Sequence, residues 1–229
     1  MNFDYRSLEN FDKIYVLVSG GFDSTYLYDR IKKLYPEKCI PVNCYNPFES
    51  SDTLKMISND PQFLQVRPYS KINYGLVLKN AFLKLPEARQ LKKIGAYTKT
   101  IFPCCYYIKH KDFKKDKRFK EPNTVVVSGI KRGDGTQRRI WLTQMKNRKK
   151  WYHRHKTGEL YCYPFRDHTK RELSDNIKKR LRKKYPNLTH SGCYLCPILV
   201  LFNIKSEGKR YKASIKYAKK LGVLDYKAL

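Results

Sequence analysis

The pattern of apolar and polar residues predicts that strands and helices alternate over the first two-thirds of the chain. Short apolar or β-branched runs predict strands at residues 14–18, 39–44, 63–66 and 124–127. Helices are expected between them, at residues 24–35, 51–59 and 74–85. This repetition predicts an α/β fold with a doubly wound, mostly parallel sheet and helices on both of its faces.

The last third of the chain has a helical and strongly basic pattern. Thr169-x-x-Glu172 is a capping box that predicts a helix reaching about Lys184. An apolar run follows at residues 197–202, and residues 211–221 have the spacing of a further helix. We therefore expect an α/β core over residues 1–150 and a basic helical region over residues 151–229, joined in one continuous globule.

The turn after the first strand has the composition of a phosphate-binding loop. Gly20 and Gly21 allow backbone N–H groups to approach an anion closely, and the helix that follows presents unpaired N–H groups. Ser19, Ser24 and Thr25 add hydroxyl donors, while Asp23 is suited to orient a Mg²⁺ ion that bridges phosphates. Because the ends of parallel strands meet at one edge of a sheet, Gly129 is expected beside this loop.

Charge points to a polyanionic partner. The 229 residues include 49 Lys and Arg against 20 Asp and Glu, for a net charge of +29. The excess concentrates at residues 109–120, 131–154 and 170–184, where aromatic side chains are interleaved. Such stretches suit a nucleic acid, either tRNA or DNA, although a solvated basic face is the alternative. Arg132, Arg138 and Arg139 are candidates for bidentate phosphate contacts.

No apolar stretch approaches the length of a membrane span, and the N-terminus lacks the apolar region of a secretory signal. We expect a cytoplasmic protein without a membrane partner. In that compartment, seven cysteines favour metal or redox chemistry over disulfides.

Four cysteines form two close pairs, Cys104–Cys105 and Cys193-x-x-Cys196. An adjacent pair is an awkward zinc ligand set, whereas iron–sulfur clusters accept varied spacings. From spacing alone, a metal site and unconnected buried thiols remain equally open. Cys39 and Cys44 are expected in the core, whereas Cys162 has no partner of known spacing, and a persulfide thiol is its candidate functional role. His153 and His155 are expected on an exposed basic loop rather than as ligands.

Five segments resemble known families in both content and order. Ser19–Ser24 matches the Ser-Gly-Gly-x-Asp-Ser of the PP-loop ATP pyrophosphatases. The segments that resemble the adenylylsulfate and phosphoadenosine phosphosulfate (PAPS) reductase branch of that superfamily are Cys104–Lys109, Ser128–Arg138, Tyr163–Thr169 and Ser191–Pro197. The resemblance covers about residues 14–197.

The resemblance implies a nucleotide site for ATP and Mg²⁺ in the 1–150 core and a 4Fe-4S cluster, with zinc as the alternative. The implied ligands of the cluster are Cys104, Cys105, Cys193 and Cys196, with Lys109 beside it. The implied nucleotide-binding residues are Ser19, Gly20, Gly21, Asp23, Ser24, Thr25, Gly129, Lys131, Arg132 and Arg138. Within this set, Asp23, Ser24 and Arg132 are the candidate catalytic residues.

The sequence departs from the reductases in ways that affect function. Ile108 occupies the position where the reductases carry arginine. Lys131 and Gly135 replace residues of the reductase motif that Ser128–Arg138 resembles. No cysteine follows Cys196, although those reductases carry a nucleophilic cysteine in a C-terminal tail. The phosphate loop also keeps the ATP-splitting form that the reductases have altered.

The favoured hypothesis is an ATP-dependent enzyme that adenylylates a nucleic-acid oxygen, releases pyrophosphate and prepares that position for sulfur insertion. It implies an external sulfur donor such as a cysteine desulfurase. A homodimer is a further expectation, because related enzymes commonly pair. The alternatives are a sulfonucleotide reductase that uses external thiols and a non-catalytic nucleic-acid-binding module with a vestigial nucleotide site.

Overall fold

The computed structural model describes residues 3–49, 51–67, 71–96, 101–102, 104, 107, 113–134, 136–168, 175–185, 193–205 and 208–224. The chain forms two compact units, each assembled from separate stretches. The sheet unit comprises residues 1–43, 51–66 and 115–191, and the helical unit comprises residues 44–50, 67–114 and 192–229. These units interleave along the sequence, whereas the expected division at residue 150 follows sequence order; that division stays a prediction.

The described strands of the sheet unit form one six-stranded sheet in the order β3-β2-β1-β4-β6-β5. Their bounds are β1 Lys13–Leu17, β2 Cys39–Cys44, β3 Leu64–Val66, β4 Thr124–Val127, β5 Tyr152–Arg154 and β6 Leu160–Cys162. β1 pairs in parallel with β2 and β4, β4 pairs in parallel with β6, and β5 runs antiparallel to β6. The expected α/β fold with a mostly parallel sheet is confirmed.

Both faces of the central strands are covered, which explains their near-continuous apolar sequence. Ile14 and Val16 of β1 share a core cluster with Leu27 and Ile31 of α1, which spans Phe22–Leu34. The intervening Tyr15 points to the other face, since side chains alternate along a strand. There it meets the ring of Phe119 edge-to-face, with centroids 4.9 Å apart.

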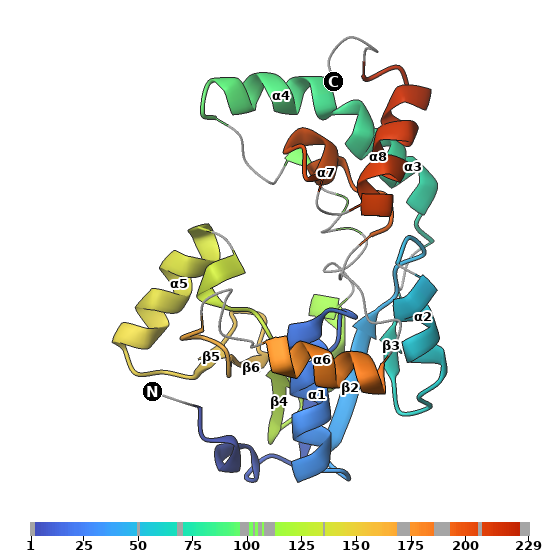
Figure 1. Cartoon of the computed structure of the whole chain (residues 1–229). Coiled ribbons are helices and arrows are strands. Elements are labelled where there is room, and N and C mark those ends of the chain that lie inside the picture. The colour runs from blue at the N-terminus through green and yellow to red at the C-terminus, as the bar shows by residue number, and fades with distance from the viewer. Residues whose placement is uncertain are drawn as a thin grey trace. The chain divides into compact units, whose positions relative to one another are not determined.

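Helix α6, Asp175–Lys184, lies alongside α1 (Figure 1). Its sequence is dominated by Lys and Arg, yet Leu181 is almost completely buried and Ile177 packs against the main core cluster. The spacing of these two residues, one helical turn apart, gives α6 a narrow apolar stripe. The capping box expected at Thr169 and Glu172 lies outside the described residues.

Several elements differ from the sequence expectation. The helix expected at 74–85 is two helices, α3 Tyr74–Leu83 and α4 Leu85–Lys93, with Pro86 in the first turn of α4. Helix α5, Thr136–Asn147, and the strands β5 and β6 were not predicted. α5 is mostly polar, and three-residue strands are too short to display an alternating pattern.

The helical unit contains α3, α4, α7 (Pro197–Leu201) and α8 (Gly208–Lys220). These helices lie together in Figure 1, and they share a core cluster that includes Leu78, Phe82, Val200 and Ala218. Cys104 belongs to the same cluster, so it is held among residues far away in sequence. Helix α2, Ser51–Ser58, belongs to the sheet unit. None of the described helices has the length and apolar character that crossing a membrane requires.

Candidate functional site

The turn between β1 and α1 has a backbone that only glycine accommodates at one position. Gly20 has a φ of +75°, and a Cβ atom built there would lie 2.1 Å from Oγ1 of Thr53 in α2. Gly21 then forms the N-cap of α1, and no side chain caps the first turn of that helix. The first-turn N–H groups of a 13-residue helix are therefore directed at the loop without a side-chain acceptor.

Hydrogen bonds within the loop fix its shape. Ser24 Oγ accepts from the Ser19 N–H at 3.1 Å and donates to the Gly21 carbonyl at 3.1 Å. Ser19 Oγ lies 3.2 Å from Ser24 Oγ, and Ser19 is exposed. Thr25 is completely buried, and its Oγ1 has no hydrogen-bond partner among the described residues. Ser24 thus shapes the loop, Ser19 faces outward, and the Thr25 side chain faces the interior.

Asn43, at the end of β2, supports the start of the loop and was missed by sequence reasoning. Its Nδ2 donates to the Val18 carbonyl at 2.9 Å, and its side chain is buried. A buried amide that binds a backbone carbonyl holds that backbone in one position. A polar residue in the otherwise apolar second strand is the signal that would have indicated this role.

Gly129 follows β4 and lies against the first turn of α1. A Cβ atom at Gly129 would lie 3.4 Å from the Ser24 nitrogen and 3.4 Å from Leu27 Cδ1. β1 and β4 are adjacent, while the chain continues from β1 to β2 on the other side. The loop therefore occupies the point where strand order reverses, which is where ligands bind in open α/β sheets.

A partly buried ion pair joins the first turn of α1 to the segment that follows β4. Lys131 Nζ donates to the Asp23 carboxylate, and the two side chains are 7% and 31% exposed. The lysine places a positive charge beside the amino end of α1, where the helix dipole is also positive. Together they create a site that favours an anion, and Asp23 keeps the lysine charge compensated.

Arg132 and Arg138 occupy different surroundings. Arg132 Nη2 donates to the Asp167 carbonyl at 2.8 Å, and its buried Nε has no hydrogen-bond partner among the described residues. Arg138 is exposed on α5. Sequence reasoning grouped these two arginines, whereas the structure places Arg132 half-buried in a 3-10 helix after β4 and Arg138 at an exposed position of α5.

The Asp167 segment, whose carbonyl accepts from Arg132, is held in place by the neighbouring Arg166. Arg166 is buried, stacks on Trp151 with its Cζ 3.7 Å from the ring centroid, and donates to the Lys150 carbonyl at 2.6 Å. It also pairs with Asp167 at 3.0 Å. Burial favours the neutral form of Asp167, but hydrogen bonds and charge from Arg166 outweigh it and lower the pKa of that carboxyl.

Three of the four expected cluster ligands are described, and all three belong to the helical unit. Cys104 is buried, while Cys193 and Cys196 are half-buried. Among the described residues, no three His, Cys, Asp or Glu side chains form a metal-binding group. Cys105, the fourth expected ligand, and Lys109 lie outside the described residues. The thiolate donors have the chemistry that a 4Fe-4S cluster needs, and the ligand set stays a prediction.

The Cys193–Cys196 segment is held by side chains that sequence reasoning missed. Asn46 is buried, and its Nδ2 donates to Cys193 Sγ at 3.2 Å. Arg210 of α8 donates to the Cys193 carbonyl from Nε at 3.2 Å and from Nη2 at 3.1 Å. The Cys196 N–H donates to Ser214 Oγ at 2.9 Å. Hydrogen bonds to a ligand sulfur tune a metal centre, so Asn46 is positioned to act on Cys193.

The remaining candidates are structural. Burial raises the pKa of the Cys162 thiol well above its ordinary value and raises that of Cys39 to about 12, so neither supplies a thiolate at neutral pH. His155 Nε2 lies 3.3 Å from the Tyr163 hydroxyl, and its ring packs 4.9 Å from that of His153. These histidines join an aromatic cluster on β5 and β6 instead of the exposed loop that was expected.

No family model matches the sequence, and no curated protein matches it. Among solved structures, the chain is similar to the U34-tRNA thiolase NcsA from Methanococcus maripaludis, which was solved with its 4Fe-4S cluster. The two share 13% sequence identity, and the match covers 98% of this chain and 77% of the thiolase with a TM-score of 0.42.

Proposed function

We propose that this chain is a PP-loop enzyme that binds Mg-ATP at the loop after β1 and transfers its adenylyl group to a nucleic-acid oxygen. The observation that carries the proposal is the loop itself. The loop lies at the point where the strand order of the sheet reverses. It leads into the N-terminus of α1, which has no side-chain cap, and the buried side chain of Lys131 lies beside it.

Each loop residue has a defined role in this proposal. The backbone N–H groups at Gly21 and the first turn of α1 bind the phosphates, and Gly20 keeps the loop in its left-handed conformation. Asp23 would hold Mg²⁺, and Lys131 contributes positive charge to the triphosphate. Ser24 preserves the shape of the loop through its bond to the Gly21 carbonyl.

In the proposed reaction, the nucleic-acid oxygen forms a bond to the α-phosphorus as the bond to the bridging oxygen of pyrophosphate breaks. Negative charge accumulates on the departing pyrophosphate. Lys131 and the helix amino end lower the energy of that charge because they already lie beside the loop, and a Mg²⁺ ion held by Asp23 would add further positive charge. Arg132 is placed to contribute from the β4 side, since the Asp167 carbonyl fixes one of its nitrogens.

Sulfur insertion completes the proposed function. A 4Fe-4S cluster would be held by Cys104, Cys105, Cys193 and Cys196, and it would either carry sulfide to the activated position or serve a structural role. This chain's own contribution is to position the ligands: Asn46 and Arg210 hold Cys193, and Ser214 holds Cys196. The sulfur donor is external, such as a cysteine desulfurase, and the activated polymer is a tRNA or DNA.

The test is pyrophosphate release from ATP in the presence of candidate nucleic acids. Asp23→Ala should abolish release, because it removes both the magnesium ligand and the partner of Lys131. Asp12→Ala, which changes an exposed aspartate in the same unit, is the matched control and should release pyrophosphate at the native rate. Release that persists in Asp23→Ala would contradict the assignment of the loop. Sulfite formed from adenylylsulfate without ATP would instead favour the reductase.

A further inference from the structure

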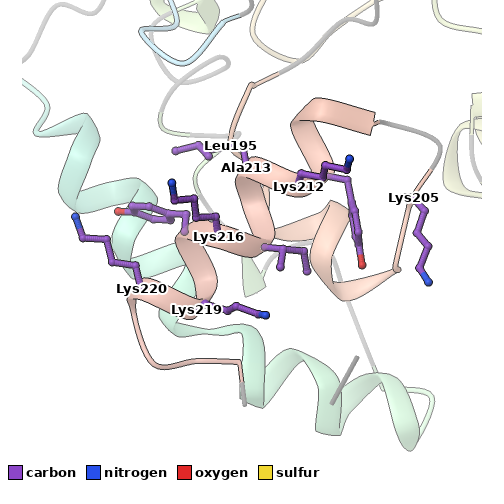
Figure 2. A pocket seen from close by; sticks show the side chains of 10 residues that line it. Leu195, Lys205, Lys212, Ala213, Lys216, Lys219 and Lys220 are labelled. Atoms are coloured by element: carbon purple, nitrogen blue, oxygen red, sulfur yellow. The ribbon is translucent and has the colours of Figure 1, made fainter. Parts of the chain in front are cut away.

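Helix α8 borders a basic pocket that the proposed nucleotide site does not use. The pocket has a volume of about 940 Å³ and is formed by α8 together with Leu195 and Lys205. Figure 2 shows Lys212, Lys216, Lys219 and Lys220 along α8, and Lys205, which precedes the helix, at the right of the view. Five of the ten lining residues are lysines: Lys205, Lys212, Lys216, Lys219 and Lys220.

The helix that borders this pocket carries no acidic residue of its own. It contains six Lys or Arg residues. Lys212 and Lys216 are exposed, and neither forms an ion pair with a carboxylate of the described residues. Being four positions apart, they lie on one side of the helix, separated by a rise of about 6 Å. Lysines in a row on one side of a helix repel each other unless an anion binds between them.

The pocket also contains two aromatic rings, each of which contacts a residue that does not line the pocket. The Tyr217 ring packs edge-to-face on Phe82, with centroids 4.9 Å apart. The Tyr211 hydroxyl donates to Asn203 Oδ1 at 2.5 Å. Both rings line the pocket beside the aliphatic side chains of Leu195 and Ile215. Rings that are already fixed lose little conformational entropy when a flat ligand stacks on them.

We infer that this pocket binds a segment of single-stranded nucleic acid, with phosphates on Lys212 and Lys216 and an unstacked base on Tyr211. The inference rests on the proposed function, for which it defines the polymer-binding surface. Basic side chains beside fixed aromatic rings are the combination that single strands require, because their bases are free to leave the stack. A duplex offers phosphates to the lysines but no base face to the tyrosine.

The pocket is linked directly to the Cys193–Cys196 segment. Leu195 lies between these cysteines in sequence and lines the pocket. Arg210 and Ser214 of α8 bind the backbone of the same segment. A nucleic acid bound along α8 would therefore lie next to the chain segment that carries two of the expected cluster ligands.

Fluorescence anisotropy with a labelled 12-nucleotide unstructured RNA tests the lysines. We expect the double variant Lys212→Ala/Lys216→Ala to bind about tenfold more weakly. Its log–log salt slope should be shallower by about 1.4, since each single-strand phosphate contact contributes about 0.7. The control Lys79→Ala/Lys93→Ala removes two exposed lysines from other helices of the same unit and should bind like the native protein. Equal losses in both double variants would overturn the inference.

Substitutions at Tyr211 separate stacking from charge. Tyr211→Ala should weaken RNA binding about tenfold, whereas Tyr211→Phe, which keeps the stacking ring and loses only the hydroxyl bond to Asn203, should weaken it by a clearly smaller factor. The native protein and Tyr211→Ala should bind an abasic oligonucleotide with the same affinity, because it has no base to stack on the ring. If Tyr211→Ala binds normally, or if polyglutamate or a 12-base-pair duplex displaces the RNA as well as unlabelled RNA does, the pocket is not a single-strand site. Circular dichroism confirms that each variant is folded.

The same measurements distinguish failure of this inference from failure of the proposed function. Asp23→Ala should release no pyrophosphate yet bind the RNA with native affinity. If the native protein releases no pyrophosphate but the α8 variants lose RNA binding, the pocket assignment stands and the enzyme proposal fails. If pyrophosphate release depends on Asp23 but the α8 variants bind normally, only the pocket assignment fails.

Discussion

At the scale of single residues, the loop after β1 depends on conformations and contacts that leave little freedom for substitution. Gly20 combines a positive φ with close approach of Thr53, so a side chain there is excluded for two reasons. Asn43 fixes the preceding carbonyl, and Lys131 joins Asp23 from the neighbouring loop. These residues come from separate segments of the chain.

We expect Gly20→Ala to lower the free energy of unfolding of the sheet unit by about 2 kcal/mol and to weaken ATP binding. The left-handed backbone alone costs a non-glycine residue about 1–3 kcal/mol, and the contact with Thr53 adds to that cost. Urea denaturation and ATP titration measure the two effects. Gly158→Ala is the control: Gly158 also has a positive φ, but its nearest neighbours are 3.8 Å away, and its substitution should leave ATP binding unchanged.

Asp116 is a second residue whose charge stabilises the sheet unit. Its carboxylate accepts from the Arg118 N–H at 3.1 Å and from Arg118 Nε and Nη2 at 2.9 and 2.6 Å. Burial favours the protonated acid, but these hydrogen bonds and the charge of Arg118 outweigh it and lower the pKa of Asp116 below 3.8.

Because that pKa is lower in the folded state, the charge of Asp116 stabilises the fold above about pH 4 and loses this effect as the pH falls further. We expect Asp116→Asn to be about 1–2 kcal/mol less stable than the native protein at pH 7. The difference should stay constant down to about pH 4.5 and shrink at lower pH, as measured by urea denaturation. A difference that grew on acidification would contradict this account.

At the scale of elements, two strongly basic helices are held by different means. α6 carries Lys and Arg over most of its surface and is anchored by Ile177 and Leu181, while Lys184 pairs with Asp29 of α1. α8 buries Ser214 and Ala218 and turns its lysines toward a pocket. Charge along a helix therefore does not by itself reveal which surface is available to a ligand.

Leu181→Ala should cost about 2–5 kcal/mol in the free energy of unfolding, the range measured for buried leucines, because α6 has only a narrow apolar stripe. Urea denaturation gives the cost, and amide hydrogen exchange should report faster opening of α6 than of β4. Lys183→Ala, at an exposed position of the same helix, should change stability by no more than about 0.5 kcal/mol. Equal stability of the two variants would contradict the proposed anchoring.

At the scale of the whole molecule, the chain separates its two candidate chemistries into two units. The phosphate-binding loop belongs to the sheet unit, and the described cysteines 104, 193 and 196 belong to the helical unit. A segment from the middle of the sequence and one from its end thus contribute to one helical core. The net charge of +29 is far larger than a triphosphate needs, which accords with a polymeric partner.

Anaerobic purification tests the cluster at this scale. We expect a brown protein that contains iron and sulfide, and Cys193→Ser or Cys196→Ser should lose most of the bound iron. Cys39→Ser should retain it, because Cys39 is buried in the sheet unit and is not an expected ligand. Iron analysis and visible absorption measure the outcome. A colourless protein that contains zinc would show that the site binds zinc instead of a 4Fe-4S cluster.

Much of the sheet and the phosphate-loop candidates could be read from the sequence because they depend on local patterns. The bounds of β2 and β4 match the apolar and β-branched runs, and a glycine turn between an apolar strand and an amphipathic helix is a local signal. The parallel arrangement followed from strand and helix alternation. α5, β5 and β6 could not be read because their sequences are polar or too short to display a period.

The partners of the candidate residues were decided only by the tertiary structure. Nothing in the sequence pairs Lys131 with Asp23, Asn43 with Val18, or Asn46 with Cys193, because each pair joins segments that meet only after the chain has folded. The same holds for the lysine row and anchored tyrosines of α8, whose apolar neighbours come from other elements. Local sequence determined most of the central strands and helices, whereas long-range packing decided which side chains meet.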